Sequence, residues 1–148
     1  MPTMNAALGL SQLKKFDKVV ELRKIAANYL LEKLQPIDEI VLPKKRDKSD
    51  HFYQQFSIRV RDASKRDKLK DFLSRRGIFS NLYYEPIHLS DYYRETGGWS
   101  EGDLPKTEVL GKTMLTLPMS PTIRRDQLDE LVKALLSFFR KPSAETKR

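Results

Sequence analysis

The stretch FYQQFSIRV, residues 52–60, alternates apolar and polar side chains, which is the pattern of a β-strand with one buried face. The apolar side chains on one face of this predicted strand are Phe52, Phe56, Ile58 and Val60, and the polar ones opposite are Gln55, Ser57 and Arg59. A strand with one apolar face needs a second layer to cover it. We therefore expect a sheet with helices packed on one side.

Further elements are predicted on both sides of this stretch. They are strands at residues 39–42, 78–84 and 114–117 and a short helix at residues 107–112. One helix is predicted from a Ser64 cap to Gly77, and a last one from a Thr122 cap to Pro142. Residues 85–103 show no regular period. This order predicts an α+β domain whose small sheet is mostly antiparallel and covered by helices on one face.

Residues 4–34 are predicted to form one long helix, which Thr3 or Asn5 would cap and Pro36 would end. Its apolar side chains recur at helical steps at Leu13, Phe16, Val20 and Ala27. Such a helix would be about 45 Å long, while a domain of this size is roughly 30 Å across. Part of the helix should project, and its small, apolar first turns, residues 4–10, should pack against something else.

These elements divide the chain into three parts. Residues 1–35 are the connecting helix, whose start faces another domain or subunit. Residues 36–141 form the small α+β domain. Residues 142–148 form a basic tail that we expect to be disordered.

The composition excludes several classes of protein. The 148 residues include no cysteine, so there is no disulfide or thiolate site, and only His51 and His88 could ligate a metal through imidazole. No apolar run reaches the roughly 18 residues that a membrane span needs. The N-terminus lacks the charged-then-apolar order of a signal peptide. We expect a soluble, cytoplasmic protein without metal or membrane contacts.

The net charge of +8 leaves a nucleic-acid partner as a less favoured alternative. The basic side chains are spread along the chain in pairs and triplets, such as Lys44–Arg46 and Arg75–Arg76. No basic run is interleaved with aromatic residues. A solvated surface accounts for this distribution.

A tyrosine-rich loop is the clearest candidate for ligand binding. The segment LYYEPIHLSDYYR, residues 82–94, holds four tyrosines, His88 and Arg94. Tyrosine and histidine offer hydrogen bonds at low entropic cost, so the loop could recognise a polar ligand. Alternatively, Tyr83 and Tyr92 fill the edges of the core and His88 bonds to a carbonyl. The residues alone favour neither reading, and no phosphate-binding glycine loop or hydrolase motif is present.

Three segments together resemble the C-terminal small domain of the DegT/DnrJ/StrS family of PLP-dependent sugar aminotransferases. Residues 1–13, MPTMNAALGLSQL, resemble the family pattern MPxxNAAxGxxQL. Residues 84–93, YEPIHLSDYY, followed by GDLP at 102–105, resemble YxPxHLxxYY and GDFP. Residues 115–121, LTLPMSP, resemble LSLPxxP before the last helix. The segments occur in the family's order over nearly the whole chain.

This resemblance implies the small domain of a fold type I aminotransferase that transfers an amino group to a nucleotide-linked keto-sugar. In the family, a large N-terminal domain carries the Schiff-base lysine and the other main contacts of PLP. No segment here resembles it. We therefore expect a domain cut from its catalytic half, inactive alone and without bound PLP. The parent would be a homodimer that binds a nucleotide-sugar.

The resemblance transfers few functional residues and no catalytic one. Asn5 matches the family asparagine that reaches the PLP phosphate of the neighbouring subunit. His88 matches a loop histidine of the nucleotide-sugar pocket, and Tyr84 would line the same cleft. Tyr83 stands where histidine is common, and such departures affect sugar specificity. The alternative function is a stand-alone module that binds a sugar nucleotide or a protein.

Overall fold

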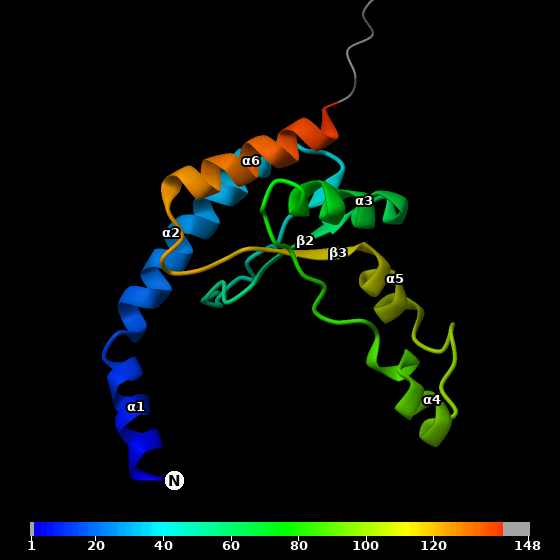
Figure 1. Ribbon diagram of the computed structural model, residues 1–148, viewed down its shortest axis with the longest axis horizontal. Coiled ribbons are helices and arrows are strands. Elements are labelled where there is room, and N and C mark those ends of the chain that lie inside the picture. Colours follow the sequence, from blue (N-terminus) through cyan, green and yellow to red (C-terminus); the bar gives the residue numbers. More distant parts are fainter. Residues whose placement is uncertain (1, 141–148) are drawn as a thin grey trace, which may run out of the picture.

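The computed structural model describes residues 2–140, shown in Figure 1. The helices are α1 (Thr3–Leu13), α2 (Phe16–Leu34), α3 (Ala63–Ser74), η1 (Ile87–Leu89, a 3-10 helix), α4 (Asp91–Gly97), α5 (Pro105–Thr113) and α6 (Arg125–Phe139). The strands are β1 (Ile40–Val41), β2 (Phe56–Val60) and β3 (Met114–Leu117). Across residues 2–140, no helix is long and apolar enough to cross a membrane. The predicted tail, residues 142–148, and Pro142 lie outside the described residues.

The three strands form one antiparallel sheet with β2 in the centre. Phe56 lies opposite Leu117, and Ile58 lies opposite Leu115. In Figure 1, α2, α3 and α6 lie on the same side of this sheet. The predicted α+β fold with a small antiparallel sheet is therefore confirmed, and the strand predicted at residues 114–117 has those bounds.

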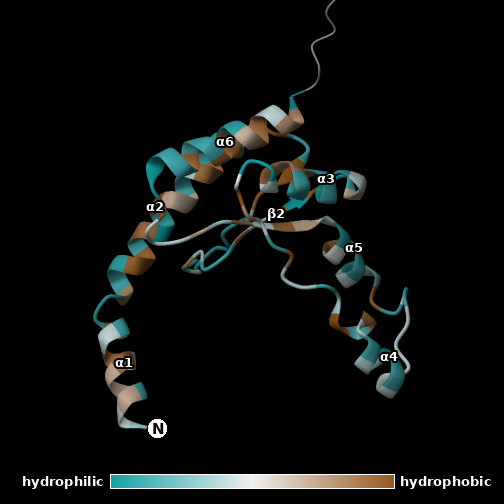
Figure 2. Cartoon of the chain, viewed as in Figure 1, coloured by the Kyte–Doolittle hydropathy of each residue, from teal (hydrophilic) through white to brown (hydrophobic). Residues whose placement is uncertain are grey.

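The core lies between the sheet and these three helices. Phe56, Ile58 and Val60 are fully buried, while Ser57 and Arg59 between them are half-buried. The helices contribute fully buried leucines at Leu30, Leu34, Leu69, Leu73 and Leu135. Figure 2 shows hydrophobic segments meeting at the sheet and hydrophilic parts of α6 outside. Because burying one leucine stabilises a fold by about 1.5–3 kcal/mol, this layer is the main source of stability.

The predicted single helix over residues 4–34 is wrong, because α1 ends at Leu13 and α2 begins at Phe16. The N–H of Lys15 donates to the carbonyl of Gln12, three residues back, so α1 ends in a tight turn. α1 buries none of its side chains and projects away from the sheet in Figure 1. Without packing contacts, nothing keeps the two helices in one straight rod, although their apolar period continues across the break.

The strand predicted over residues 52–60 begins only at Phe56. Tyr53 is buried with a φ of 47°, so the chain turns there instead of extending. Its N–H donates to Nδ1 of His51 at 2.9 Å, which stabilises the turn. The turn places Phe52 at 49 % exposure, so its predicted place on the core face is wrong.

The strand predicted over residues 78–84 is reduced to a single bridge. Asn81 exchanges both backbone hydrogen bonds with Thr116, at 3.0 and 2.8 Å. The carbonyl of Met114 instead accepts a hydrogen bond from Arg66 at 3.4 Å. β3 is four residues long, and the backbone N–H and C=O groups of every second residue face β2. On the outer edge this leaves only Thr116 free to pair with another strand.

Two helices begin on different residues from those predicted. Asp62, and not Ser64, is the N-cap of α3, and its Oδ1 accepts the N–H of Ser64 at 2.9 Å. Arg124, and not Thr122, is the N-cap of α6, and its N–H donates to Oε1 of Gln127 at 3.0 Å. Several small polar residues stand near each start, and the path of the incoming chain selects among them.

Candidate functional site

Residues 85–103, predicted to be irregular, form an arm that contains η1 and α4. Figure 1 shows this arm leaving the sheet on the opposite side of the molecule from α1. His88 lies on η1 and is 5 % exposed, whereas Tyr84 lies just before it and is 73 % exposed. The two predicted substrate contacts therefore lie on the same segment, but His88 is buried and Tyr84 is exposed.

His88 is bonded to a buried carboxylate, Glu108 of α5. Its Nε2 lies 3.1 Å from Oε1 of Glu108. The same carboxylate accepts the N–H of Gly102 at 2.9 Å and the N–H of Leu104 at 3.2 Å. Glu108 thus joins η1, the turn at residues 102–104 and α5. Sequence reasoning missed Glu108 because it is twenty residues from His88 and belongs to no motif quoted above.

The hydrogen bonds around Glu108 control its charge. Burial raises the pKa of this carboxyl. Hydrogen bonds from His88, Gly102 and Leu104 lower the pKa, and their combined effect is larger, so the pKa lies below the ordinary value. Glu108 is therefore ionised at neutral pH. A second carboxylate of the arm behaves similarly, since the N–H and hydroxyl of Ser100 lower the pKa of Asp103.

The tyrosines of the loop are at the surface. Tyr83 and Tyr84 meet edge to face with centroids 5.2 Å apart, and Tyr92 and Tyr93 do the same at 5.2 Å. Tyr83 is 43 % exposed and Tyr92 is 67 % exposed, so the reading that they fill core edges is wrong. The bond of His88 goes to a carboxylate instead of a carbonyl. The exposed rings leave stacking faces available to a ligand.

Asn5 lies on α1, far from the arm in Figure 1. The N-cap of α1 is Pro2, so neither Thr3 nor Asn5 caps the helix. The Asn5 side chain is exposed and makes no hydrogen bond with the described residues. Within one chain the structure does not bring Asn5 together with Tyr84 and His88.

The described lysines do not have the environment of a reactive amine. None of them is buried, and Lys24 alone is half-buried, in an ion pair with Asp50 at 2.6 Å. Hydrogen bonding to Glu32 raises the pKa of Lys33, and bonding to Glu101 raises that of Lys112. A lysine that attacks a carbonyl needs a lowered pKa, so these shifts have the opposite direction.

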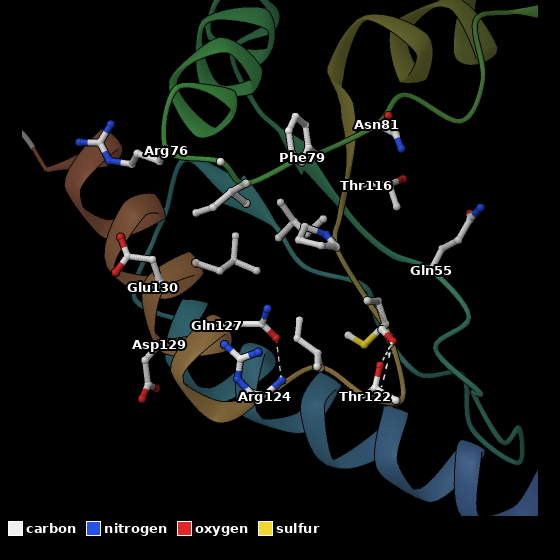
Figure 3. Close-up of a pocket in the computed structure, with 18 of the residues that line it drawn as sticks. Gln55, Arg76, Phe79, Asn81, Thr116, Thr122, Arg124, Gln127, Asp129 and Glu130 are labelled. Carbon is white, nitrogen blue, oxygen red and sulfur yellow. Dashed lines mark hydrogen bonds between the residues drawn. The ribbon is translucent and has the colours of Figure 1, made fainter.

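A groove of about 1320 Å³ lies beside β3, between α6 and residues 76–83 (Figure 3). Its lining carries both basic and acidic side chains, and several of them form ion pairs with each other or with a neighbouring residue. Arg124 donates to Asp126 at 2.8 and 3.0 Å, and Arg125 beside the groove pairs with Asp129 at 3.3 Å. Sequence reasoning did not point to this groove. Its lining holds the basic side chains Arg23, Arg76, Arg124 and Lys133 and the acidic side chains Asp126, Asp129 and Glu130.

Glu108 gives the fold an expected acid sensitivity. Because its folded pKa lies below the ordinary value of 4.5, its ionised form stabilises the fold above that pH, and this contribution disappears as the pH falls through the folded value. Wild type should melt at a higher temperature than Glu108→Gln at pH 7, with a smaller difference below pH 4.5. Thermal unfolding across this range checks the prediction.

The matched control is Glu101→Gln, which removes an exposed carboxylate that pairs with Lys112 at 2.7 Å on the same arm. Exposed ion pairs contribute little, so this variant should differ from wild type by only a small, nearly constant amount. A Glu108→Gln difference that is independent of pH would contradict the assigned charge of Glu108.

Comparisons with known proteins match this fold to one family. The sequence profile described as the DegT/DnrJ/EryC1/StrS aminotransferase family matches residues 1–136. The chain is 37 % identical over 141 residues to a "Pleiotropic regulatory protein" of Geobacillus stearothermophilus, covering 93 % of this chain and 37 % of the relative. It is 25 % identical over 136 residues to the spore coat polysaccharide biosynthesis protein SpsC of Bacillus subtilis, covering 89 % and 35 %.

Solved structures match as well. DesV of S. venezuelae superposes with a TM-score of 0.87 at 28 % identity, over 95 % of this chain and 37 % of that one. A DegT DnrJ EryC1 StrS aminotransferase from Brucella abortus superposes with a TM-score of 0.76 at 30 % identity, over 89 % and 34 %. The chain thus spans little more than a third of the length of these relatives. The chain belongs to the DegT/DnrJ/EryC1/StrS aminotransferase family.

Proposed function

We propose that this chain supplies the small domain of a PLP-dependent aminotransferase that acts on a nucleotide-linked keto-sugar, and that it does not catalyse the transfer alone. The observation that carries the proposal is the family match over residues 1–136, which includes both the projecting helix and the sheet. Because the match covers about a third of the relatives' length, the remaining parts of the enzyme would come from residues outside this match.

The lysines support the second half of the proposal. PLP, when bound, takes up an amino group from a donor and passes it to the keto-sugar, and it is anchored through a lysine. The described lysines are exposed or ion-paired, and none of them is buried. They do not fit the anchor of the cofactor, so we assign no catalytic residue to this chain.

Asn5 fits a contact to the phosphate of the cofactor. Its exposed amide stands in the first turn of α1, where backbone N–H groups point out of the helix toward an anion. By the resemblance to the family, the phosphate that Asn5 would reach belongs to a site in the neighbouring subunit. Its role is to hold the phosphate end of PLP in place.

Tyr84 and His88 are the proposed contacts to the sugar nucleotide. Tyr84 offers an exposed ring and a hydroxyl, which suit a base or a sugar face. His88 is the second proposed contact, although it is only 5 % exposed inside the arm. The arm and α1 lie on opposite sides of the molecule in Figure 1.

Labelling of lysines with PLP tests the proposal. The purified chain is incubated with PLP, reduced with borohydride and mapped by peptide mass spectrometry. We expect scattered, substoichiometric labelling of exposed lysines, because none of the described lysines is buried beside a site that would hold the cofactor.

The control is the same chain unfolded in urea, which should give a similar scatter. Stoichiometric labelling of a single lysine in the folded chain, lost on unfolding, would mean that the chain has its own cofactor site. The proposal would then be wrong.

A further inference from the structure

The contacts of Glu108 determine how the ring of His88 is protonated. The carboxylate accepts the N–H of Gly102 at 2.9 and 3.1 Å and the N–H of Leu104 at 3.2 Å. Backbone N–H groups only donate, so the oxygens of Glu108 act as acceptors toward both. An ionised carboxylate has no hydrogen to give. The hydrogen between Glu108 Oε1 and His88 Nε2, 3.1 Å apart, therefore belongs to the ring.

The other ring nitrogen has no partner. The His88 side chain is only 5 % exposed. Its Nδ1 atom is buried and makes no hydrogen bond with the described residues. The Trp99 ring stands edge-on to the imidazole at 6.2 Å between centroids. A hydrogen on Nδ1 would therefore be buried without an acceptor among the described residues.

We propose that Glu108 is the positioning residue of His88: it fixes the Nε2–H tautomer and thereby keeps Nδ1 as a free hydrogen-bond acceptor. The consequence rests on the proposed function, in which His88 contacts the sugar nucleotide. An acceptor recognises a hydroxyl or an N–H group of a sugar, whereas it repels phosphate and carbonyl oxygens. Glu108 thus determines which groups of a ligand can hydrogen-bond to Nδ1 of His88, namely those that donate a hydrogen.

The tautomer is measured directly by nitrogen NMR of the imidazole rings in the chain labelled with ¹⁵N-histidine. With only two histidines, a His51→Gln variant assigns the spectrum. At neutral pH we expect His88 to show a proton on Nε2 and none on Nδ1. In Glu108→Met, which keeps the side-chain length but offers no oxygen, the Nδ1–H tautomer should gain population because no acceptor holds Nε2–H.

Glu101→Gln is the control, because it changes an exposed carboxylate of the arm that does not contact His88; its ring spectrum should match wild type. A proton on Nδ1 of wild-type His88 overturns the proposal, even where Glu108→Met does not fold. An unchanged tautomer in folded Glu108→Met overturns it too. Neither result involves PLP, a sugar nucleotide or activity, so failure here is distinct from failure of the proposed function.

Discussion

Phe56→Ala should lower the free energy of unfolding by about 3–5 kcal/mol, the typical loss for a large buried aromatic side chain. Phe56 is fully buried in the central strand, opposite Leu117, and its ring stacks on Tyr53 with centroids 6.3 Å apart. Removing the ring leaves a cavity that the sheet and the covering helices cannot close. Urea unfolding followed by circular dichroism measures the change.

Phe79→Ala is the matched control. Phe79 is 75 % exposed, so the same substitution should change stability by only about 0.5 kcal/mol or less. Equal losses in the two variants would mean that the central strand does not form the core described here.

Leu13→Glu and Leu8→Glu should each weaken any self-association of the chain at least about tenfold, which corresponds to roughly 1.4 kcal/mol. α1 buries none of its side chains among the described residues, and Met4, Leu8, Leu10 and Leu13 are all more than 60 % exposed. An interface over this helix would bury their side chains, and a glutamate there would lose apolar burial and need desolvation. Sedimentation velocity over a range of concentrations gives the dissociation constants.

Leu136→Glu on α6 provides the comparison, because Leu136 is 41 % exposed on a helix that already packs on the sheet. This variant should associate like wild type. Association that is insensitive to both α1 substitutions, or stronger loss in Leu136→Glu, would place the associating surface elsewhere.

Local patterns predicted those elements that pack directly on the core. The alternation at Phe56, Ile58 and Val60 predicted both the strand and its buried face, since side chains alternate across a strand whatever lies beyond it. The strand at residues 114–117 was predicted with its bounds for the same reason. The order of the elements predicted the α+β class, and the family motifs named Asn5, Tyr84 and His88, whose roles remain predictions.

Other features depend on contacts between distant segments. Among the described residues α1 buries no side chain, so packing does not hold it in line with α2, although the apolar period continues across the break. Residues 78–84 have the composition of a strand, yet the edge of β3 offers only Thr116 for pairing. Phe52 fits the alternation but lies before the turn at Tyr53, which His51 stabilises.

The sequence by itself determined the α+β class, the core face of the central strand and the family. Only the tertiary structure decided what His88 faces, because Glu108 reaches it through folding of the arm and not through sequence proximity. The hydrogen bonds that the fold brings to Glu108 then determined its charge against the effect of burial, and burial left Nδ1 of the ring without a partner among the described residues. Periodicity reflects which side chains avoid water, whereas hydrogen bonds between buried polar groups depend on geometry that no local pattern contains.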